Sequence, residues 1–514
     1  MLAKDLLLRN VRNRPDKEAI YCEPCDLRLT YREFDRRVNS LCNMLLQNGV
    51  KKGDRIAITA SNCHIQPEII MTAAKGGWAL VEIDYRLSSD EMEYIISDTE
   101  PRVLFVGRDL EDVTAPLFSK FPDLEKVSFP EDYNRVIATY SDQDPEIEFE
   151  EEEIITILYT SGTTGMPKGV IYTHKNLMAS VVTRACTLYT CENDRTLHTS
   201  PFTHVAATWP FLLHCYHGGS NVIITNPDGV HILEIIEKER ITTWNSVPAL
   251  LIRILDVKDK ERFDISSLRW ITYGAAPIAM PVLRKALDYF GPIMNHVYGC
   301  TETYLLSCLK AEDFKLDGTE TEKEIRRMLA SCGKEAINTE TRVVNEDGVP
   351  VKPGEVGEII TRGDHVTPGY WRKEEETRKS IKNGWFYTGD LATVDEEGYL
   401  YIVGRKKDII ITGGENVAPK EVENVLYKHE AVKEVAVVGL PHKKWGEAIA
   451  GFVILKDGAE VAENDLIAFS RERLAGYKTP KTIVFVEDFP RTPSGKILTR
   501  RLRDLHVDYF VKEV

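Results

Sequence analysis

A polar, glycine-rich stretch in the first third of the chain has the composition of a polyphosphate-binding loop. It follows residues 154–158, an apolar run rich in β-branched side chains that predicts a buried strand. Glycines in residues 159–169 let backbone N–H groups face an anion, while Ser and Thr hydroxyls and the Lys168 ammonium add further donors. The stretch is not a Walker A loop, because no Gly-Lys-Ser/Thr ending follows Gly162. A plain surface turn is the alternative for such a composition.

The elements that must position this loop alternate between strands and helices. Residues 55–59, 102–106 and 221–225 predict short buried strands. Residues 31–46 and 281–290 carry apolar side chains at helical spacing. This alternation predicts an α/β fold in which parallel-rich sheets are flanked by helices.

The chain is long enough to require at least two domains, because 514 residues exceed what one hydrophobic core usually serves. After residue 384 paired strands and turns predict a β-rich subdomain, and past residue 407 a compact α+β unit follows. We therefore expect a large N-terminal domain at residues 1–406 and a smaller C-terminal domain at residues 407–514. Acidic residues dominate positions 142–153 and predict a solvated linker arm leading to the glycine-rich loop.

Composition excludes several classes of function. A net charge of −15 argues against a nucleic-acid-binding surface. No apolar run is long enough to span a bilayer and no signal-type segment opens the chain, so we expect a cytoplasmic protein with reduced thiols. Of the ten cysteines only Cys22 and Cys25 are close in sequence, and the lack of a second such pair argues against zinc.

Residues 159–169 resemble, almost residue for residue, the phosphate loop of the adenylate-forming superfamily, which includes acyl-CoA synthetases, luciferases and adenylation domains. Further matching motifs follow in one order up to residue 496, and the pattern is most similar to an acyl-CoA synthetase. The resemblance implies ATP, Mg²⁺ and coenzyme A. The loop residues that it places at the phosphates are Thr160, Ser161, Gly162, Thr163, Thr164, Gly165 and Lys168.

Later segments would hold the rest of the nucleotide, as the resemblance implies. Tyr298 would stack on adenine, Thr301 would touch the α-phosphate, and Glu302 would bind Mg²⁺, which prefers hard oxygen ligands. The Asp390 carboxylate would accept hydrogen bonds from both ribose hydroxyls, and Arg405 would be its partner at the ribose. Taken singly, these motifs also fit core residues, a solvated helix start and a turn. The remaining implied contacts are Gly274, Ala275, Ala276, Pro277, Asn295, His296, Gly299, Cys300 and Ile402.

The resemblance assigns the acyl and CoA steps to other residues. Lys496 would neutralise charge on the carboxylate and α-phosphate during adenylation, and Lys407 would be the hinge of a mobile C-terminal domain. His204 would gate the acyl pocket, although a lone histidine is more often a core residue. The implied catalytic and metal-binding set is Lys496, Glu302, Thr163, Lys168 and His204, with Glu302 and Thr163 at the metal. The implied acyl-pocket residues are His204, Val205, Thr208 and Trp209, and those on the CoA path are Gly413, Gly414, Glu415, Lys443 and Trp445.

We therefore expect an ATP-dependent acid–CoA ligase that forms an acyl-adenylate and pyrophosphate, then an acyl-CoA and AMP. An aliphatic or aromatic monocarboxylate is the expected acid. One alternative is an enzyme of the same fold that transfers the acyl group to a carrier protein or another acceptor. A second is a non-catalytic nucleotide-binding regulator, against which the joint presence of the motif residues argues. The expected partners are small molecules, with no nucleic acid, and a homodimer is left open.

Overall fold

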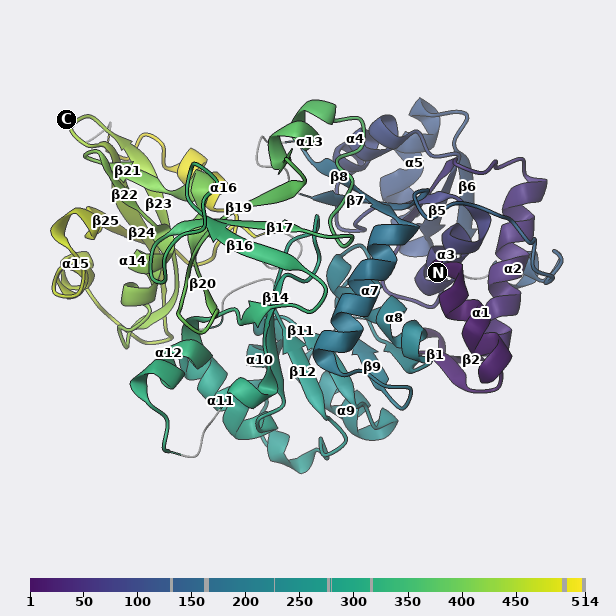
Figure 1. Ribbon diagram of the computed structural model, residues 1–514, viewed down its shortest axis with the longest axis horizontal. Helices are drawn as coiled ribbons and strands as arrows, with labels where there is room; N and C mark the ends of the chain where they lie inside the picture. The colour runs from purple at the N-terminus through teal and green to yellow at the C-terminus, as the bar shows by residue number, and fades with distance from the viewer. Residues whose placement is uncertain are drawn as a thin grey trace. The chain divides into compact units, whose positions relative to one another are not determined.

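The computed structural model describes residues 1–129, 133–160, 166–225, 227–274, 278, 280–314, 318–491 and 497–510 (Figure 1). The chain divides into two compact units. Unit 1 comprises residues 1–328, 332–341 and 361–386, and unit 2 comprises residues 329–331, 342–360 and 387–514. The expected domain boundary at residues 406–407 falls inside unit 2, so that boundary stays a prediction.

A six-stranded sheet in unit 1 carries the glycine-rich loop. Its strands are, in spatial order, β6 (Glu125–Phe129), β5 (Val103–Gly107), β3 (Arg55–Thr59), β4 (Ala79–Glu82), β7 (Ile154–Thr160) and β8 (Lys168–Thr173). Neighbouring strands are parallel except for the antiparallel pair β7–β8. This arrangement confirms the expected parallel-rich sheet.

Helices cover both faces of this sheet (Figure 1). Apolar residues of α4 (Ser89–Thr99) and α5 (Glu111–Lys120) pack with Ala57, Val81 and Leu104 on one face. Those of α2 (Tyr31–Gln47) and α3 (Ile65–Gly76) pack with Ile56, Leu80 and Phe105 on the other. Successive strand residues therefore point to opposite apolar layers, which is why these strands are buried runs without polar alternation.

A nine-stranded sheet, also in unit 1, is parallel from β13 to β1 and has antiparallel strands at both edges. In spatial order its strands are β15 (Lys334–Glu335), β14 (Ser307–Leu309), β13 (Met294–Tyr298), β12 (Trp270–Tyr273), β11 (Thr243–Ser246), β9 (Arg195–His198), β10 (Ser220–Ile223), β1 (Glu18–Cys22) and β2 (Leu27–Thr30). The remaining helices of this part of the chain are α1 (Lys4–Asn13), α6 (Tyr133–Ile137), α7 (His174–Leu188), α8 (Val205–His217), α9 (Gly229–Glu239), α10 (Pro248–Leu255), α11 (Met280–Phe290), α12 (Glu322–Ala330) and α13 (Glu374–Ser380).

Two smaller sheets complete the described fold. The first has the order β16 (Glu340–Val344), β17 (Gly357–Arg362), β19 (Trp385–Val394) and β18 (Ile381–Lys382), with β20 (Leu400–Arg405) also paired to β19. The second has the order β22 (Glu415–Val417), β21 (Ile410–Thr412), β24 (Gly446–Leu455) and β23 (Val432–His442), with β25 (Thr482–Phe485) paired to β24. Apolar residues of α14 (Pro419–Leu426) and α15 (Glu463–Arg471) form one core with this second sheet, and α16 (Thr499–Leu505) contributes to another. These elements form the β-rich and α+β parts that the sequence predicts.

The acidic arm at residues 142–153 is only partly solvated, in contrast to the expectation from its composition. The Asp142 carboxylate lies 2.6 Å from the guanidinium of Arg36. The Asp144 carboxylate lies 2.8 Å from the ammonium of Lys75, whose side chain is buried. These ion pairs fasten the arm to α2 and α3, which the local charge pattern alone does not predict.

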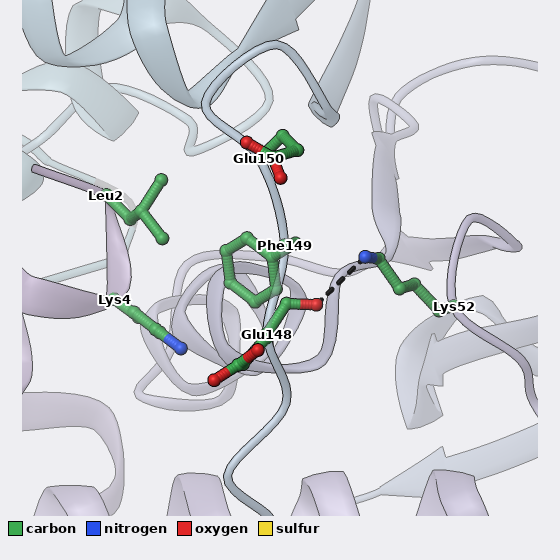
Figure 2. A pocket seen from close by; sticks show the side chains of 6 residues that line it. All are labelled: Leu2, Lys4, Lys52, Glu148, Phe149 and Glu150. Carbon is green, nitrogen blue, oxygen red and sulfur yellow. Dashed lines mark hydrogen bonds between the residues drawn. The ribbon is translucent and has the colours of Figure 1, made fainter.

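Phe149 anchors the same arm through its ring. The ring stacks on His174 with centroids 4.7 Å apart, and the Lys4 ammonium lies 4.6 Å from its centroid. Figure 2 shows Phe149 in the wall of a pocket, between the side chains of Lys4 and Lys52. Lys52 also donates to the Glu148 carbonyl oxygen at 2.9 Å. None of the expected site residues lines this pocket.

Candidate active site

The glycine-rich loop joins two paired strands. In the β7–β8 register Thr160 lies opposite Lys168, and the Thr160 hydroxyl is 3.5 Å from the Lys168 carbonyl oxygen. β8 leads directly into α7, where Thr173 and Asn176 form a reciprocal capping box. The hairpin and the cap therefore fix both ends of the loop. Five expected contacts lie outside the described residues: Ser161, Gly162, Thr163, Thr164 and Gly165.

Four side chains of unit 1, Lys168, Glu302, Tyr370 and Glu376, form what we call the Lys168 cluster. The Lys168 ammonium pairs with the Glu376 carboxylate and lies 5.1 Å from the centroid of the Tyr370 ring. The Tyr370 hydroxyl donates to Glu302 Oε1 at 2.8 Å. Tyr370 thus connects the lysine expected at the phosphates with the carboxylate expected at Mg²⁺.

Hydrogen bonds and burial shift the pKa values of side chains in the Lys168 cluster. The hydrogen bond from Lys168, aided by one from Lys379, lowers the pKa of Glu376. Burial, aided by the nearby Glu302 charge, raises the pKa of Tyr370, so its hydroxyl keeps the proton that it donates. A phosphate group would compete with Glu376 for the same ammonium. Sequence reasoning missed both Tyr370 and Glu376, since no local pattern marks either of them.

The turn after β13 holds Glu302 through its backbone. The Tyr172 hydroxyl donates to the Thr301 carbonyl oxygen. The backbone N–H of Thr367 donates to the Glu302 carbonyl oxygen at 2.8 Å. Backbone contacts from two directions therefore fix the position from which the Glu302 carboxylate projects.

Two glycines lie at neighbouring strand ends where an adenine-lining surface is expected. Gly274 follows β12 and Gly299 follows β13, and these parallel strands end at the same edge of the sheet. A Cβ on Gly299 would lie 1.6 Å from the Tyr304 carbonyl oxygen. A Cβ on Gly274 would lie 2.6 Å from the Val297 carbonyl oxygen. Both positions therefore require glycine for backbone packing, whatever they bind.

Other expected nucleotide contacts on β13 and just after it also have partners within the protein. The His296 ring stacks on Tyr273 with centroids 4.8 Å apart and planes 5° from parallel. Asn295 Oδ1 accepts a hydrogen bond from a downstream backbone N–H at 3.1 Å. Cys300 Sγ lies 3.3 Å from the hydroxyl of Thr303. Three expected contacts on the preceding loop, Ala275, Ala276 and Pro277, lie outside the described residues.

The residues expected at the acyl pocket surround the start of α8. His204 is the N-cap residue of this helix, followed by Val205, and burial lowers the pKa of the His204 imidazole. The imidazole is therefore neutral at pH 7. Trp209 is fully buried, with its ring centroid 4.5 Å from that of Tyr172.

A buried carboxyl group that sequence reasoning missed lies beside Thr208. Glu82, the last residue of β4, has its two carboxyl oxygens 3.1 and 3.4 Å from the Thr208 hydroxyl oxygen. The same hydroxyl lies 2.5 Å from the Phe202 carbonyl oxygen. Burial raises the pKa of Glu82 to about 8, so this side chain is mostly protonated at neutral pH.

In unit 2 the expected ribose pair is formed. Asp390 and Arg405 lie opposite each other on β19 and β20, with Asp390 Oδ1 2.8 Å from Arg405 Nε. The preceding residue, Gly389, has a positive φ of 74°, and its N–H donates to Glu358 at 3.1 Å. A guanidinium at this distance holds the Asp390 carboxylate in one orientation, which suits bidentate recognition of a diol.

The expected hinge follows the same hairpin. Ile402 lies on β20, and Lys407 lies in the short 3₁₀ helix η5 (Lys406–Asp408) that links β20 to β21. The Lys407 side chain is exposed. Its position between two sheets of unit 2 agrees with a connecting role, and hinge motion stays a prediction.

The residues expected along the CoA path gather at one turn of unit 2. Gly413 and Gly414 join β21 to β22, and their φ values of 61° and 87° are those of a tight hairpin turn that favours glycine. The Gly413 N–H donates to the Trp445 carbonyl oxygen at 2.8 Å. Glu415 and Lys443 are exposed. The structure thus brings together two segments that are far apart in the sequence.

Lys496, the expected adenylation lysine, lies outside the described residues. Within the described ranges, no group of three or more His, Cys, Asp or Glu side chains could hold a metal ion. Mg²⁺ often shares its oxygen ligands between the protein and substrate phosphates, and Thr163, the second expected metal ligand, lies outside the described residues. In the same part of the chain, no helix combines the length and the apolar character that crossing a membrane requires.

Comparison with protein families gives two matches. The profile of the AMP-binding enzyme family matches residues 7–371, and that of the AMP-binding enzyme C-terminal domain matches residues 421–496. The chain is 34% identical over 491 residues to a 2-succinylbenzoate–CoA ligase of Bacillus cereus, covering 96% of each chain. It is 34% identical over 476 residues to a feruloyl-CoA synthase of Amycolatopsis sp, covering 92% of this chain and 93% of the relative.

Solved structures give a consistent result. ATP-bound MatB from Rhodopseudomonas palustris superposes with a TM-score of 0.89 at 28% identity, covering 99% of this chain and all of that one. The o-succinylbenzoate CoA synthetase of Bacillus subtilis, in complex with the acyl-adenylate intermediate OSB-AMP, superposes with a TM-score of 0.85 at 28% identity. That match covers 97% of this chain and 98% of the neighbour.

Proposed function

We propose how this protein works from one premise: the chain belongs to the AMP-binding enzyme family and is an AMP-forming acid–CoA ligase. In the first step a substrate carboxylate oxygen attacks the α-phosphorus of ATP, and pyrophosphate leaves. In the second step the CoA thiol attacks the acyl carbon, and AMP leaves. The protein acts mainly by positioning the reactants and neutralising charge.

The Lys168 cluster is the observation that carries the first step. Lys168 lies at the end of the glycine-rich loop, and Tyr370 connects it to Glu302. We assign Lys168 to the phosphates of ATP, where its ammonium would exchange Glu376 for a phosphate oxygen. The Glu302 carboxylate fits Mg²⁺, which would neutralise phosphate charge when bound. Asp390, oriented by Arg405, is assigned to the ribose hydroxyls.

The acid is proposed to be an aromatic or aliphatic carboxylic acid. Two observations support this class of acid. The side chains around the start of α8 include the buried Trp209 ring, and its neighbour Thr208 faces the mostly protonated Glu82. The relatives described as 2-succinylbenzoate–CoA ligase and feruloyl-CoA synthase act, by their names, on aromatic acids.

The test is AMP release from ATP and CoA with a panel of acids: ferulate, 2-succinylbenzoate, octanoate and malonate. We expect AMP release that requires both acid and CoA, with an aromatic or medium-chain acid preferred. Acid-dependent exchange of labelled pyrophosphate into ATP without CoA would show the adenylation step alone. A protein that performs this exchange but releases no AMP with CoA uses another acceptor. Absence of exchange with every acid would favour the non-catalytic alternative.

A matched pair of variants connects the activity to the Lys168 cluster. Lys168→Ala should lower pyrophosphate exchange, because it removes a charge from the phosphate site. Lys175→Ala removes a lysine on α7, seven residues later, whose closest described carboxylate contact is 3.7 Å long, and should leave exchange unchanged. Equal effects of the two substitutions would contradict the assignment.

A further inference from the structure

Two cysteines at the end of β1 lie within bridging distance of each other. Cys22 is the last residue of β1 and is buried, whereas Cys25 is the last residue of the 3₁₀ helix η1 (Glu23–Cys25) and is exposed. Cys22 is also the N-cap residue of η1, so one turn of 3₁₀ helix separates it from Cys25. Side chains three residues apart in a 3₁₀ helix lie on the same side, and a rise of about 2 Å per residue places their Cα atoms about 6 Å apart. A disulfide joins Cα atoms about 4.4–6.8 Å apart.

A histidine and a carboxylate from α3 and its N-terminus complete the cluster. His64 Nδ1 lies 2.8 Å from Glu68 Oε1, and both side chains are buried. Glu68 also accepts from Arg37 Nε at 2.7 Å and from the Tyr133 hydroxyl at 2.7 Å. Although burial raises the pKa of Glu68, its hydrogen bond with His64 and the Arg37 charge lower it overall, so the carboxylate is ionised. Glu68 therefore fixes the imidazole and favours its protonated form.

The two thiols of the cluster have different pKa values. Hydrogen bonds with Cys22 and then with His64 lower the pKa of Cys25 to about 5. The hydrogen bond to Cys25 and burial raise the pKa of Cys22. Burial lowers the pKa of His64, but hydrogen bonds with Cys25 and Glu68 outweigh it and raise the value to about 9. These shifts make Cys25 the ionised thiol and Cys22 the protonated thiol at neutral pH.

We propose that Cys22 and Cys25 are a redox-active dithiol that hydroperoxides oxidise to an intrachain disulfide, with His64 as a positioning residue. The exposed Cys25 is the attacking sulfur, and the buried Cys22, reached only from within the protein, is the resolving sulfur. An attacking thiolate with a neighbouring second thiol is the arrangement found in reversible redox-sensitive sites.

The chemistry balances as a two-electron oxidation of the dithiol by one hydroperoxide. The Cys25 thiolate attacks one peroxide oxygen, the O–O bond breaks, and the leaving alkoxide takes a proton from solvent. Cys25 is then a sulfenic acid. The Cys22 sulfur attacks the Cys25 sulfur, the S–O bond breaks, and hydroxide leaves as water with the Cys22 proton. The sum is two thiols and one hydroperoxide going to one disulfide, one alcohol and one water.

Cys63, next to His64, offers a competing use of the same groups as metal ligands. Burial raises the pKa of the Cys63 thiol to about 12, which opposes the thiolate form that zinc requires. Among the described residues the structure also forms no ligand set for a metal ion. The dithiol reaction needs only Cys22 and Cys25, so Cys63 is a bystander in this proposal.

Intact mass and peptide mapping of the full chain test the disulfide directly. After brief treatment with a small excess of hydrogen peroxide, we expect the protein to lose the mass of two hydrogens. Trypsin cleaves after Lys17 and Arg28, so both cysteines stay on one peptide, residues 18–28. That peptide should take up two iodoacetamide groups before oxidation and none after it. Dithiothreitol should restore both.

Three variants identify the roles. In Cys22→Ser the reaction should stop at the sulfenic acid of Cys25, trapped as a dimedone adduct. In Cys25→Ser the peptide should resist oxidation. Cys186→Ser, which removes an exposed cysteine on α7, is the matched control and should still form the disulfide.

The pH profile of alkylation tests the role of His64. The rate at Cys25 should be nearly constant between about pH 6 and 8, because the thiol is already ionised, whereas the rate for free cysteine, measured in parallel, should rise about tenfold per pH unit. His64→Gln should move the Cys25 profile to higher pH. The wild-type profile is informative even if that variant folds poorly.

Several results would overturn the proposal. A wild-type Cys25 profile that rises like that of free cysteine would show that no thiolate is stabilised. A peroxide-induced disulfide that joins Cys63, or no loss of hydrogen mass while Cys186 is oxidised, would also refute it. One equivalent of zinc in the purified protein, released together with two reactive thiols, would assign the cluster to a metal instead.

Discussion

We expect unit 1 to lose stability as the pH rises, because Glu82 ionises. Replacing Glu82 by glutamine should prevent this loss. The Thr208 hydroxyl has one proton, and the Phe202 carbonyl oxygen, at 2.5 Å, is its nearest acceptor. The hydrogen bond that this hydroxyl donates to Glu82, 3.1 Å away, lowers the pKa of Glu82, but by less than burial raises it. Only 4% of Glu82 is exposed to solvent, which disfavours its ionised form.

The magnitude follows from the pKa of Glu82 in the two states. Burial raises the folded-state pKa from the ordinary 4.5 to about 8, so the unfolded chain loses its proton first as the pH rises. The stabilising contribution is complete below about pH 4.5 and is lost as the pH rises through about 8. At 1.36 kcal/mol per pK unit, the free energy of unfolding should fall by about 3.5 kcal/mol between about pH 5 and pH 8. Glutamine cannot ionise, so Glu82→Gln should gain about this much over the wild type across that range.

The measurement is the difference in thermal midpoint between Glu82→Gln and the wild type at about pH 5, 6.5 and 8, at constant ionic strength. This difference should grow with pH in favour of the variant, by several degrees. Glu68→Gln is the matched control, because Glu68 is a buried glutamate that is ionised and paired with Arg37. It should be less stable than the wild type, since it leaves a buried cation without its partner. A Glu82→Gln difference that stays constant with pH would refute the reasoning.

Four further predictions concern the ligase reaction. Lys496→Ala should lower pyrophosphate exchange by a factor of about 100 or more while sparing thioester formation from supplied acyl-adenylate; equal loss of both half-reactions would contradict its assignment. Glu302→Gln should raise the Mg²⁺ concentration needed for adenylation, and an unchanged Mg²⁺ titration would count against a metal role. Asp390→Asn should raise the KM for ATP about tenfold, the scale of one hydrogen bond to a charged group, and an unaltered KM would exclude it from the ribose site. Lys407→Pro should keep pyrophosphate exchange but lose thioester formation, because proline fixes φ at the expected hinge. Lys407→Ala, the control, should keep both activities. A proline variant that makes acyl-CoA at the wild-type rate would place the hinge elsewhere.

Local motifs were enough to predict contacts between segments that are close in the chain. The strand predicted at residues 154–158 is confirmed as part of β7, which pairs with β8 so that Thr160 lies opposite Lys168. Asp390 and Arg405 are confirmed as a pair because they flank one hairpin, where register alone brings them together. In each case the contact depends on strand register and turn geometry, which the types of the neighbouring residues determine.

Contacts between distant segments could not be predicted in this way. Glu376 meets Lys168 across 208 residues, and no pattern near either residue indicates the other. The acidic arm illustrates the same limit, because its composition indicates solvation whereas Asp144 pairs with the buried Lys75. A charged residue pairs with whichever opposite charge lies near it in space. Which charge that is depends on how whole sheets and helices pack.

The sequence by itself determined the family and the alternation of strands and helices, because these depend on local residue types and spacing. Only the tertiary structure decided the protonation of Glu82 and the reactivity expected of Cys25. The sequence analysis found Cys22 and Cys25 as an isolated pair, and the fold places His64 beside them, some forty residues later. Burial and the charges of neighbours set a pKa, and both quantities exist only after the chain has folded.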